Sequence, residues 1–275
     1  MRHNVSSIDP DTLDPAKALT QSKNSMLNKV PEITIFFWII KVLATTIGET
    51  AADFLNEKLN LGLTITTLIM SAFLVIILIF QFKSKKYVPG IYWLAVVLIS
   101  VVGTLITDNL VDNMGVPLQT TTIIFAIALI MTFVVWYMNE KTLSIHSIRT
   151  TKREGFYWAA ILFTFSLGTA AGDLIAEGLD LGYWKSAVLF AGLIALVAIA
   201  HRHLKLDAIW AFWIAYILTR PLGASLGDFL SQPRADGGLG LGTAGTSGIF
   251  LATILCVVVF LTVTKRDQAK QISDS

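Results

Sequence analysis

Four copies of one sequence pattern constrain this chain more than any other feature. In each copy an aromatic residue and a Trp are followed, ten residues after the Trp, by Gly, then five later by Asp and two later by Leu or Ile. The first copy comprises Phe37, Trp38, Gly48, Asp53 and Leu55. The equivalent residues of the others are Tyr92, Trp93, Gly103, Asp108 and Leu110; Tyr157, Trp158, Gly168, Asp173 and Ile175; and Phe212, Trp213, Gly223, Asp228 and Leu230. Four ungapped matches containing Trp and Asp indicate internal duplication.

Each copy lies in an apolar segment of about 20 residues, the length that crosses a bilayer as a helix. A mean hydropathy of +0.67 with 15% charged residues excludes a soluble domain. The motif spans are predicted at 34–58, 91–113, 155–179 and 207–231, and plainer spans follow them at Leu63–Phe82, Leu118–Met138, Tyr183–Ala200 and Gly245–Val263. The expected fold is an all-α polytopic membrane protein: eight transmembrane helices as four tandem two-helix repeats, with pseudo-symmetry about the membrane normal.

The sequence divides into a membrane domain and two tails. Residues 1–32 are polar and lack the apolar core of a cleaved signal peptide, so we expect a flexible cytoplasmic tail before an uncleaved first span. The transmembrane domain is predicted at 33–264, with repeats at 33–85, 86–140, 150–204 and 205–264, and a cytoplasmic C-terminal tail at 265–275.

Lysine and arginine concentrate in the loops before the second, third and fourth motifs and after the last span. By the positive-inside rule, both termini are then cytoplasmic. The aromatic doublets would lie at the cytoplasmic interface, where Trp commonly anchors a helix, and the acids would lie in the outer half of the membrane. The proposed interfacial anchors are Trp38, Trp93, Trp158 and Trp213.

Polar residues recur every four positions along the motif spans and so share one helix face. Lipid cannot solvate such a stripe, so we expect the four stripes to converge on one cation or proton path inside the protein. Its acids are Glu49, Asp53, Asp108, Asp173 and Asp228, with Glu57, Asp112 and Glu177 one turn nearer the outer surface. Its supporting residues are Thr45, Thr104, Thr169, Lys41 and Arg220.

Neighbouring carboxylates cannot all stay ionised without compensation, so such a cluster binds cations or takes up protons. Oxygen ligands without cysteine suit Mg²⁺, Mn²⁺, Ca²⁺ or protons. The candidate metal ligands are Glu49, Asp53, Asp108, Asp173 and Asp228. The basic residues Lys41 and Arg220 either form local ion pairs that make burial tolerable or act as counter-cations that hold the site closed without substrate. The motif glycines are expected to mark close helix packing.

The four two-span repeats, each with a Trp and an intramembrane Asp, resemble the bacterial membrane-protein family built of the repeat of unknown function DUF347. The resemblance covers nearly all of residues 34–264 and depends on the four motif Trp with their Gly and Asp partners. It implies a bacterial inner-membrane location and the four-repeat layout, but no substrate.

The leading hypothesis is a secondary transporter for a small cation, preferably proton-coupled export of a divalent metal such as manganese. The alternatives are a non-transporting scaffold in which Asp residues act as interhelical hydrogen-bond glue, or an exporter of organic cations. No nucleophile–base pair, HExxH or phosphate loop is present, so an enzyme, a cofactor and a nucleic-acid partner are not expected. The expected partners are the lipid bilayer, a small cation and protons, and a homo-oligomer is left open.

The lysine and arginine asymmetry yields a topology prediction. Single cysteines placed at Asn60, Gly115, Gly182 and Gly238 in a variant lacking Cys256 should all react with a membrane-impermeant thiol reagent added outside the cell. One of the four protected outside and labelled from the cytoplasm would contradict the parallel orientation of the repeats.

Overall fold

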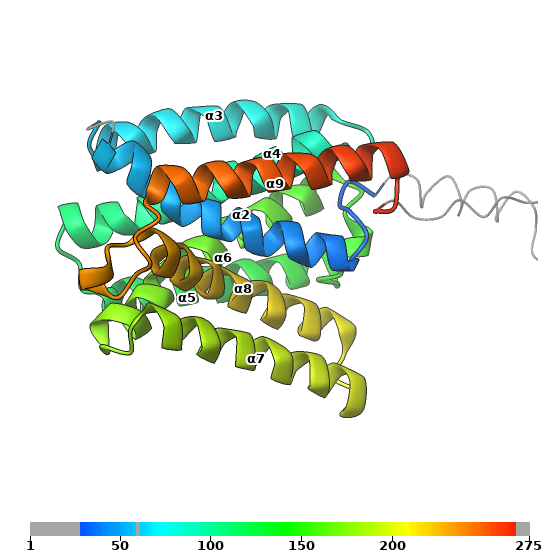
Figure 1. Ribbon diagram of the computed structural model, residues 1–275. Coiled ribbons are helices and arrows are strands. Elements are labelled where there is room, and N and C mark those ends of the chain that lie inside the picture. The colour runs from blue at the N-terminus through cyan, green and yellow to red at the C-terminus, as the bar shows by residue number, and fades with distance from the viewer. Residues whose placement is uncertain (1–27, 59–60, 268–275) are drawn as a thin grey trace, which may run out of the picture.

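The computed structural model describes residues 28–58 and 61–267 and is all-helical over those ranges (Figure 1). Its long helices are α2 (Ile35–Asp53), α3 (Leu63–Lys83), α4 (Pro89–Asp108), α5 (Leu118–Glu140), α6 (Thr151–Asp173), α7 (Tyr183–His203), α8 (Ala208–Ser231) and α9 (Thr243–Thr264). All 8 are long and apolar enough to cross a membrane. The predicted multi-pass fold of four two-helix repeats is therefore confirmed.

Local sequence signals explain where these helices begin. The Thr34 hydroxyl accepts from the Phe37 amide at the start of α2, and the Asp207 carboxylate caps α8 by accepting from the Ile209 and Trp210 amides. Pro89 opens α4, where its missing N–H leaves no helical hydrogen bond unmade. The outer helices α3, α7 and α9 each follow a glycine with positive φ, namely Gly62, Gly182 and Gly242.

The four motif helices, α2, α4, α6 and α8, form a closed inner ring. Each packs against the motif helices of the preceding and following repeats, and α8 closes the ring against α2. The second helix of each repeat lies outside and packs on the motif helix of the next repeat: α3 on α4, α5 on α6, α7 on α8 and α9 on α2. The repeats thus interlock in cyclic order around an axis parallel to the helices.

Burial separates the two kinds of helix. In the motif helices 56–67% of the most apolar window is buried, against 17–22% in the outer helices, so the outer helices present their apolar side chains to lipid. Both ends of the described chain lie at the same end of the bundle, at the right of Figure 1.

The motif glycines make the ring contacts, as the sequence predicted. A Cβ on Gly103 would lie 2.9 Å from the Phe165 Cβ of the next helix. The same collision would occur between Gly48 and Ser100, Gly168 and Arg220, and Gly223 and Thr45. In every case the contacted residue lies three positions before the glycine of its own helix. We call these four residues the ring glycines.

The aromatic doublets close one end of the ring. Each first aromatic packs against the Trp of a neighbouring repeat, with ring centroids at 5.6 Å for Phe37–Trp93, 5.6 Å for Tyr92–Trp158, 6.2 Å for Tyr157–Trp213 and 5.8 Å for Phe212–Trp38. We call these eight residues the aromatic girdle and this end of the bundle the aromatic end.

Burial of the girdle departs from the expectation of interfacial anchors. Trp93, Trp158 and Trp213 are 2%, 4% and 1% exposed, and Trp38 is partly buried. An anchor in the headgroup region keeps its ring at the lipid interface, whereas these rings pack inward because the inner faces of the four helices converge.

Residues 28–32, assigned from sequence to the N-terminal tail, pack across the aromatic end, while 1–27 and 268–275 lie outside the described residues. The ammonium of Lys29 donates to Glu154 Oε2 at 2.7 Å and to the Phe82 carbonyl at 3.0 Å. Tyr87 donates to Asp267 Oδ2 at 2.6 Å, and burial raises the pKa of both groups. No sequence pattern could pair Lys29 with Glu154, which lies 125 positions away.

The ring contacts predict a position-specific cost of adding one methyl group. Gly48→Ala and Gly223→Ala should each lower the free energy of unfolding by about 1–3 kcal/mol, because the added carbon collides with the hydroxyl oxygen and Cβ of the facing Ser100 or Thr45 and also crowds its backbone. The matched control is Gly192→Ala on the outer helix α7, where no atom lies within 4 Å of the added Cβ. Thermal unfolding midpoints in detergent compare the two ring variants with the control. Equal midpoints for all three variants would contradict the ring packing.

Candidate functional site

The motif acids Asp53, Asp108, Asp173 and Asp228 occupy one level of the ring, five residues after each ring glycine. We call them the acid layer. In the first three repeats the α-helix changes to a π-helical turn at the next residue: η2 is Phe54–Lys58, η3 is Asn109–Asn113 and η5 is Leu174–Gly178. In the fourth repeat α8 continues to Ser231. Such π-turns recur at functional sites, where they redirect side chains.

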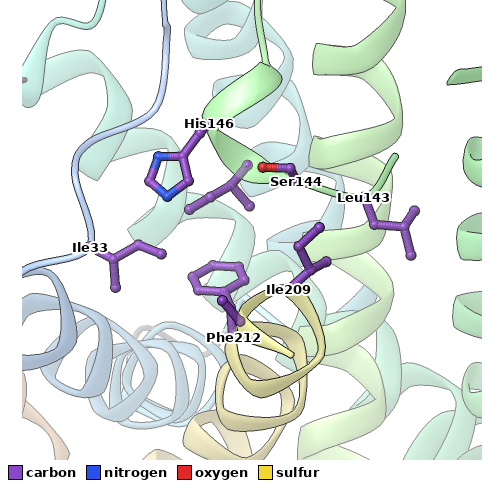
Figure 2. Close-up of a pocket in the computed structure, with 8 residues that line it drawn as sticks. Ile33, Leu143, Ser144, His146, Ile209 and Phe212 are labelled. Atoms are coloured by element: carbon purple, nitrogen blue, oxygen red, sulfur yellow. The ribbon is translucent and has the colours of Figure 1, made fainter. Parts of the chain in front are cut away.

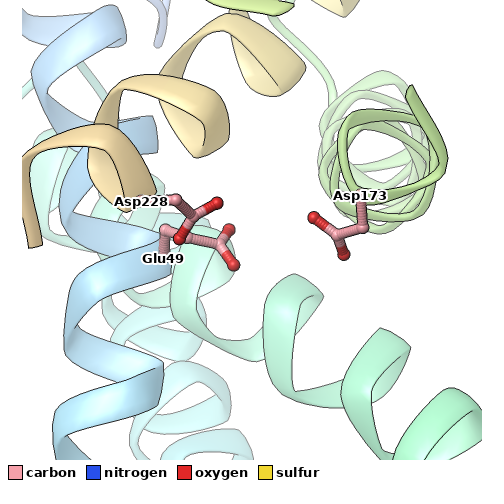
Figure 3. A group of neighbouring side chains, drawn as sticks. All are labelled: Glu49, Asp173 and Asp228. Atoms are coloured by element: carbon pink, nitrogen blue, oxygen red, sulfur yellow. The ribbon is translucent and has the colours of Figure 1, made fainter. Parts of the chain in front are cut away.

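Three carboxylates converge from three repeats (Figure 3). Glu49 on α2, Asp173 on α6 and Asp228 on α8 each offer one oxygen, and these oxygens all lie within 4.8 Å of one another. Glu49 and Asp228 are each only 6% exposed, and Asp173 is partly buried. A cation that binds oxygen at about 2.1–2.6 Å needs little side-chain movement to join oxygens at this separation.

The remaining acid-layer residues surround this group. Asp108 is partly buried and lies close enough to Glu49, Asp173 and Asp53 for their carboxylates to repel its own. The carboxylate of Asp53 likewise repels that of Asp228. Within the described chain, no hydrogen-bond donor reaches the carboxylates of Asp108, Asp173 or Asp228. No hydrogen bond from the described residues therefore offsets the repulsion among these three carboxylates, and a bound cation or proton would reduce it.

The predicted outer acids lie in the π-turns. Asp112 in η3 and Glu177 in η5 are exposed, and the Tyr183 hydroxyl donates to Glu177 Oε1 at 3.0 Å. Glu57 belongs to η2, but its side chain lies outside the described part of the structure. We call this end of the bundle the acidic end.

Beneath the acid layer, the guanidinium of Arg220 occupies the centre of the ring. Arg220 is fully buried, and its Nη2 donates to Glu49 Oε2 at 2.9 Å, to Thr169 Oγ1 at 2.7 Å and to Thr104 Oγ1. Its Nη1 donates to the Thr45 carbonyl at 3.4 Å. The buried ion pair that both sequence interpretations of Arg220 require is thus formed with Glu49.

This arrangement follows from the repeat. The residues after the ring glycines are Glu49, Thr104, Thr169 and Ala224. Arg220 therefore contacts the equivalent residue of each of the other three repeats, while its own repeat supplies the small Ala224. We call the point where these side chains meet the ring centre.

Lys41 lies between the ring centre and the aromatic girdle. It is fully buried, and its Nζ lies 4.1 Å from the ring centroid of Phe165 and 4.2 Å from that of Tyr216. Within the described residues its Nζ has no hydrogen-bond acceptor, so the local ion pair with Glu49 or a motif Asp, one of the two interpretations of Lys41 from sequence, is not formed. Cation–π contact replaces it because two aromatic side chains, rather than acids, occupy the neighbouring helices at this level.

A separate pocket opens at the aromatic end, beside the girdle (Figure 2). Its lining includes Ile33, Leu143, Ile209 and Phe212, with His146 and Ser144 as polar members. It includes no acid and none of the path or metal residues predicted from sequence. The acid layer, rather than this pocket, carries the chemistry of a cation site.

The fold and the acid layer together define a multi-pass membrane protein built of four repeats around an internal polar centre. The model of the Repeat of Unknown Function (DUF347) matches the chain four times, at residues 36–87, 91–142, 156–205 and 211–267. The chain therefore belongs to the DUF347 family. No curated protein matches it. No solved structure matches it either.

The geometry distinguishes Glu49, whose carboxylate pairs with the buried Arg220, from Asp228, whose carboxylate accepts no hydrogen bond from the described residues. Glu49→Gln should destabilise the protein by about 3–5 kcal/mol, because it leaves the Arg220 guanidinium buried without its anion. Asp228→Asn, equally buried, should leave stability unchanged or raise it, because it removes repulsion without breaking a hydrogen bond. Thermal midpoints at low ionic strength compare the two, and an equal loss in both variants would show that the acids contribute alike to the fold.

Proposed function

We propose that this protein is a secondary transporter for a small cation, exchanging a divalent metal such as manganese for protons. The observation that carries the proposal is the convergence of Glu49, Asp173 and Asp228 from three helices onto one small volume within the membrane-spanning segments. Three oxygens of this kind are hard ligands, suited to Mn²⁺, Mg²⁺ or Ca²⁺.

The charge balance supports exchange rather than simple binding. In the described part of the chain, the four carboxylates of Glu49, Asp108, Asp173 and Asp228 lie near one guanidinium, that of Arg220. The excess negative charge at this depth needs either a metal ion or protons, and both would use the same oxygens. Binding of one then displaces the other, which is the basis of proton-coupled metal transport.

Access to the acid layer differs between the two ends of the bundle. The aromatic girdle fills the ring at one end, whereas Asp112 and Glu177 are exposed at the other. We therefore propose that ions reach the acid layer from the acidic end. With the orientation that the lysine and arginine distribution predicts, the acidic end faces outward, and export would require the girdle to open toward the cytoplasm.

The scaffold alternative assigns the acids to hydrogen bonds between helices. Other side chains already make those bonds: Thr45 donates to the Thr219 carbonyl at 3.2 Å, and Thr107 to the Ser166 carbonyl at 3.1 Å. The ring helices are therefore tied together without Asp108, Asp173 or Asp228, and this favours a transport role for the three acids.

Flux in proteoliposomes tests the proposal. The purified protein should move Mn²⁺ in response to a pH gradient, and Asp173→Asn should reduce the flux at least tenfold, because the amide cannot replace a charged ligand. The matched control is Asp180→Asn, an exposed position with a φ of 54° that asparagine tolerates, which should transport normally.

If intact, monodisperse wild-type protein transports none of Mn²⁺, Mg²⁺ and Ca²⁺, the hypothesis of divalent-metal transport is contradicted. A metal flux that does not depend on the pH gradient would still support a metal site at the acid layer, but it would contradict the coupling of transport to protons.

A further inference from the structure

Three hydrogen bonds of Arg220 come from a single nitrogen atom. Glu49 Oε2, Thr104 Oγ1 and Thr169 Oγ1 all accept from Nη2, and each comes from a different repeat. Oxygens arranged around one point are typical of the coordination of a small cation. Stable recognition of a guanidinium instead uses two parallel N–H groups on one carboxylate.

The rest of the guanidinium is poorly satisfied at the ring centre. Arg220 Nε is buried and has no acceptor in the described part of the chain, and Nη1 reaches only the Thr45 carbonyl, at 3.4 Å. An orphaned buried donor costs free energy. The surrounding oxygens therefore fit the position of Nη2 better than they fit the whole side chain.

We infer that the ring centre is a second cation site, for a small monovalent cation, which Arg220 fills in this state. The ligands would be one carboxylate and two hydroxyls, those of Glu49, Thr104 and Thr169. One carboxylate balances one positive charge, so this ligand set suits Na⁺, K⁺ or NH₄⁺ and leaves a divalent ion undercompensated.

Glu49 connects this site with the outer one. Its carboxylate pairs with Arg220 at the ring centre and also contributes an oxygen to the group with Asp173 and Asp228. A cation in the acid layer therefore competes with Arg220 for Glu49, and a released Arg220 would leave the ring centre open to a monovalent ion. This place in a transport cycle rests on the proposed function; the existence of the site does not.

Removal of the tethered cation tests the site directly. Arg220→Met should be stabilised by at least one of Na⁺, K⁺ and NH₄⁺ at low millimolar concentration, seen as a rise of several degrees in thermal midpoint relative to choline at equal ionic strength. Wild-type protein should show no such selective rise, because Arg220 already occupies the site.

The control is the double variant Glu49→Gln with Arg220→Met, which removes both charges and should fold in choline without any cation-specific rise. Thr104→Val in the Arg220→Met background should weaken the rise about tenfold in ligand concentration, because it removes one oxygen.

A folded Arg220→Met protein with no selective stabilisation would overturn the inference, as would an equal rise in the double variant. Failure of Arg220→Met to fold in any of the three salts would overturn it too, because a site that accepts free cations would be rescued by one of them. Transport is not measured here, so loss of the metal-flux proposal would leave these outcomes unaffected.

Discussion

The close approach of the motif helices at the ring glycines is the constraint on which the rest of the structure depends. With no side chain at Gly48, Gly103, Gly168 and Gly223, each helix rests against the residue three positions before the next helix's glycine. That contact fixes both the spacing and the axial register of the ring. The residues after the glycines therefore meet at the ring centre, and the acids five residues after them form one layer. The polar side chains are therefore brought together by contacts at glycines, which have no side chain of their own.

Much of this arrangement follows from sequence because the repeat is ungapped. The eight spans, their bounds within a few residues and the convergence of the polar stripes all derive from hydrophobic length, the fixed spacing and the inability of lipid to solvate acids. The packing role of the glycines was also predictable, since small residues let helix backbones approach closely. The central position of Arg220 could have been inferred from its place three residues before Gly223, had the register of neighbouring helices been known.

Other features were beyond a single sequence. The four Trp were predicted as interfacial anchors because aromatic residues at a span end commonly lie at the interface, but three of them are buried in the girdle. At the end of a span, an aromatic side chain can point outward to the lipid interface or inward to the neighbouring helices. The spacing of the doublets along the sequence does not distinguish these two orientations. The placement of each outer helix on the next repeat, and the pairing of Lys29 with Glu154, depend on contacts between distant segments that no local pattern encodes.

The charged residues that differ between the four repeats lie close to the central axis of the ring, and their position bears on what they do. Residues that only hold the ring together can be alike in all four repeats, as the ring glycines and the girdle are. Glu49, Arg220 and Lys41 each break the pattern: their counterparts at the same level are Thr104, Ser100 and Val96 in the second repeat. The fourth motif helix also lacks the π-turn that follows the other three motif acids. A charge in a membrane interior is costly, so a structure needing only stability would gain by losing all three. Their position between the acid layer and the girdle lies on the path that the transport proposal assigns to an ion, so that proposal gives the asymmetric residues a role beside the repeated acids, whereas a purely structural role leaves their cost unexplained.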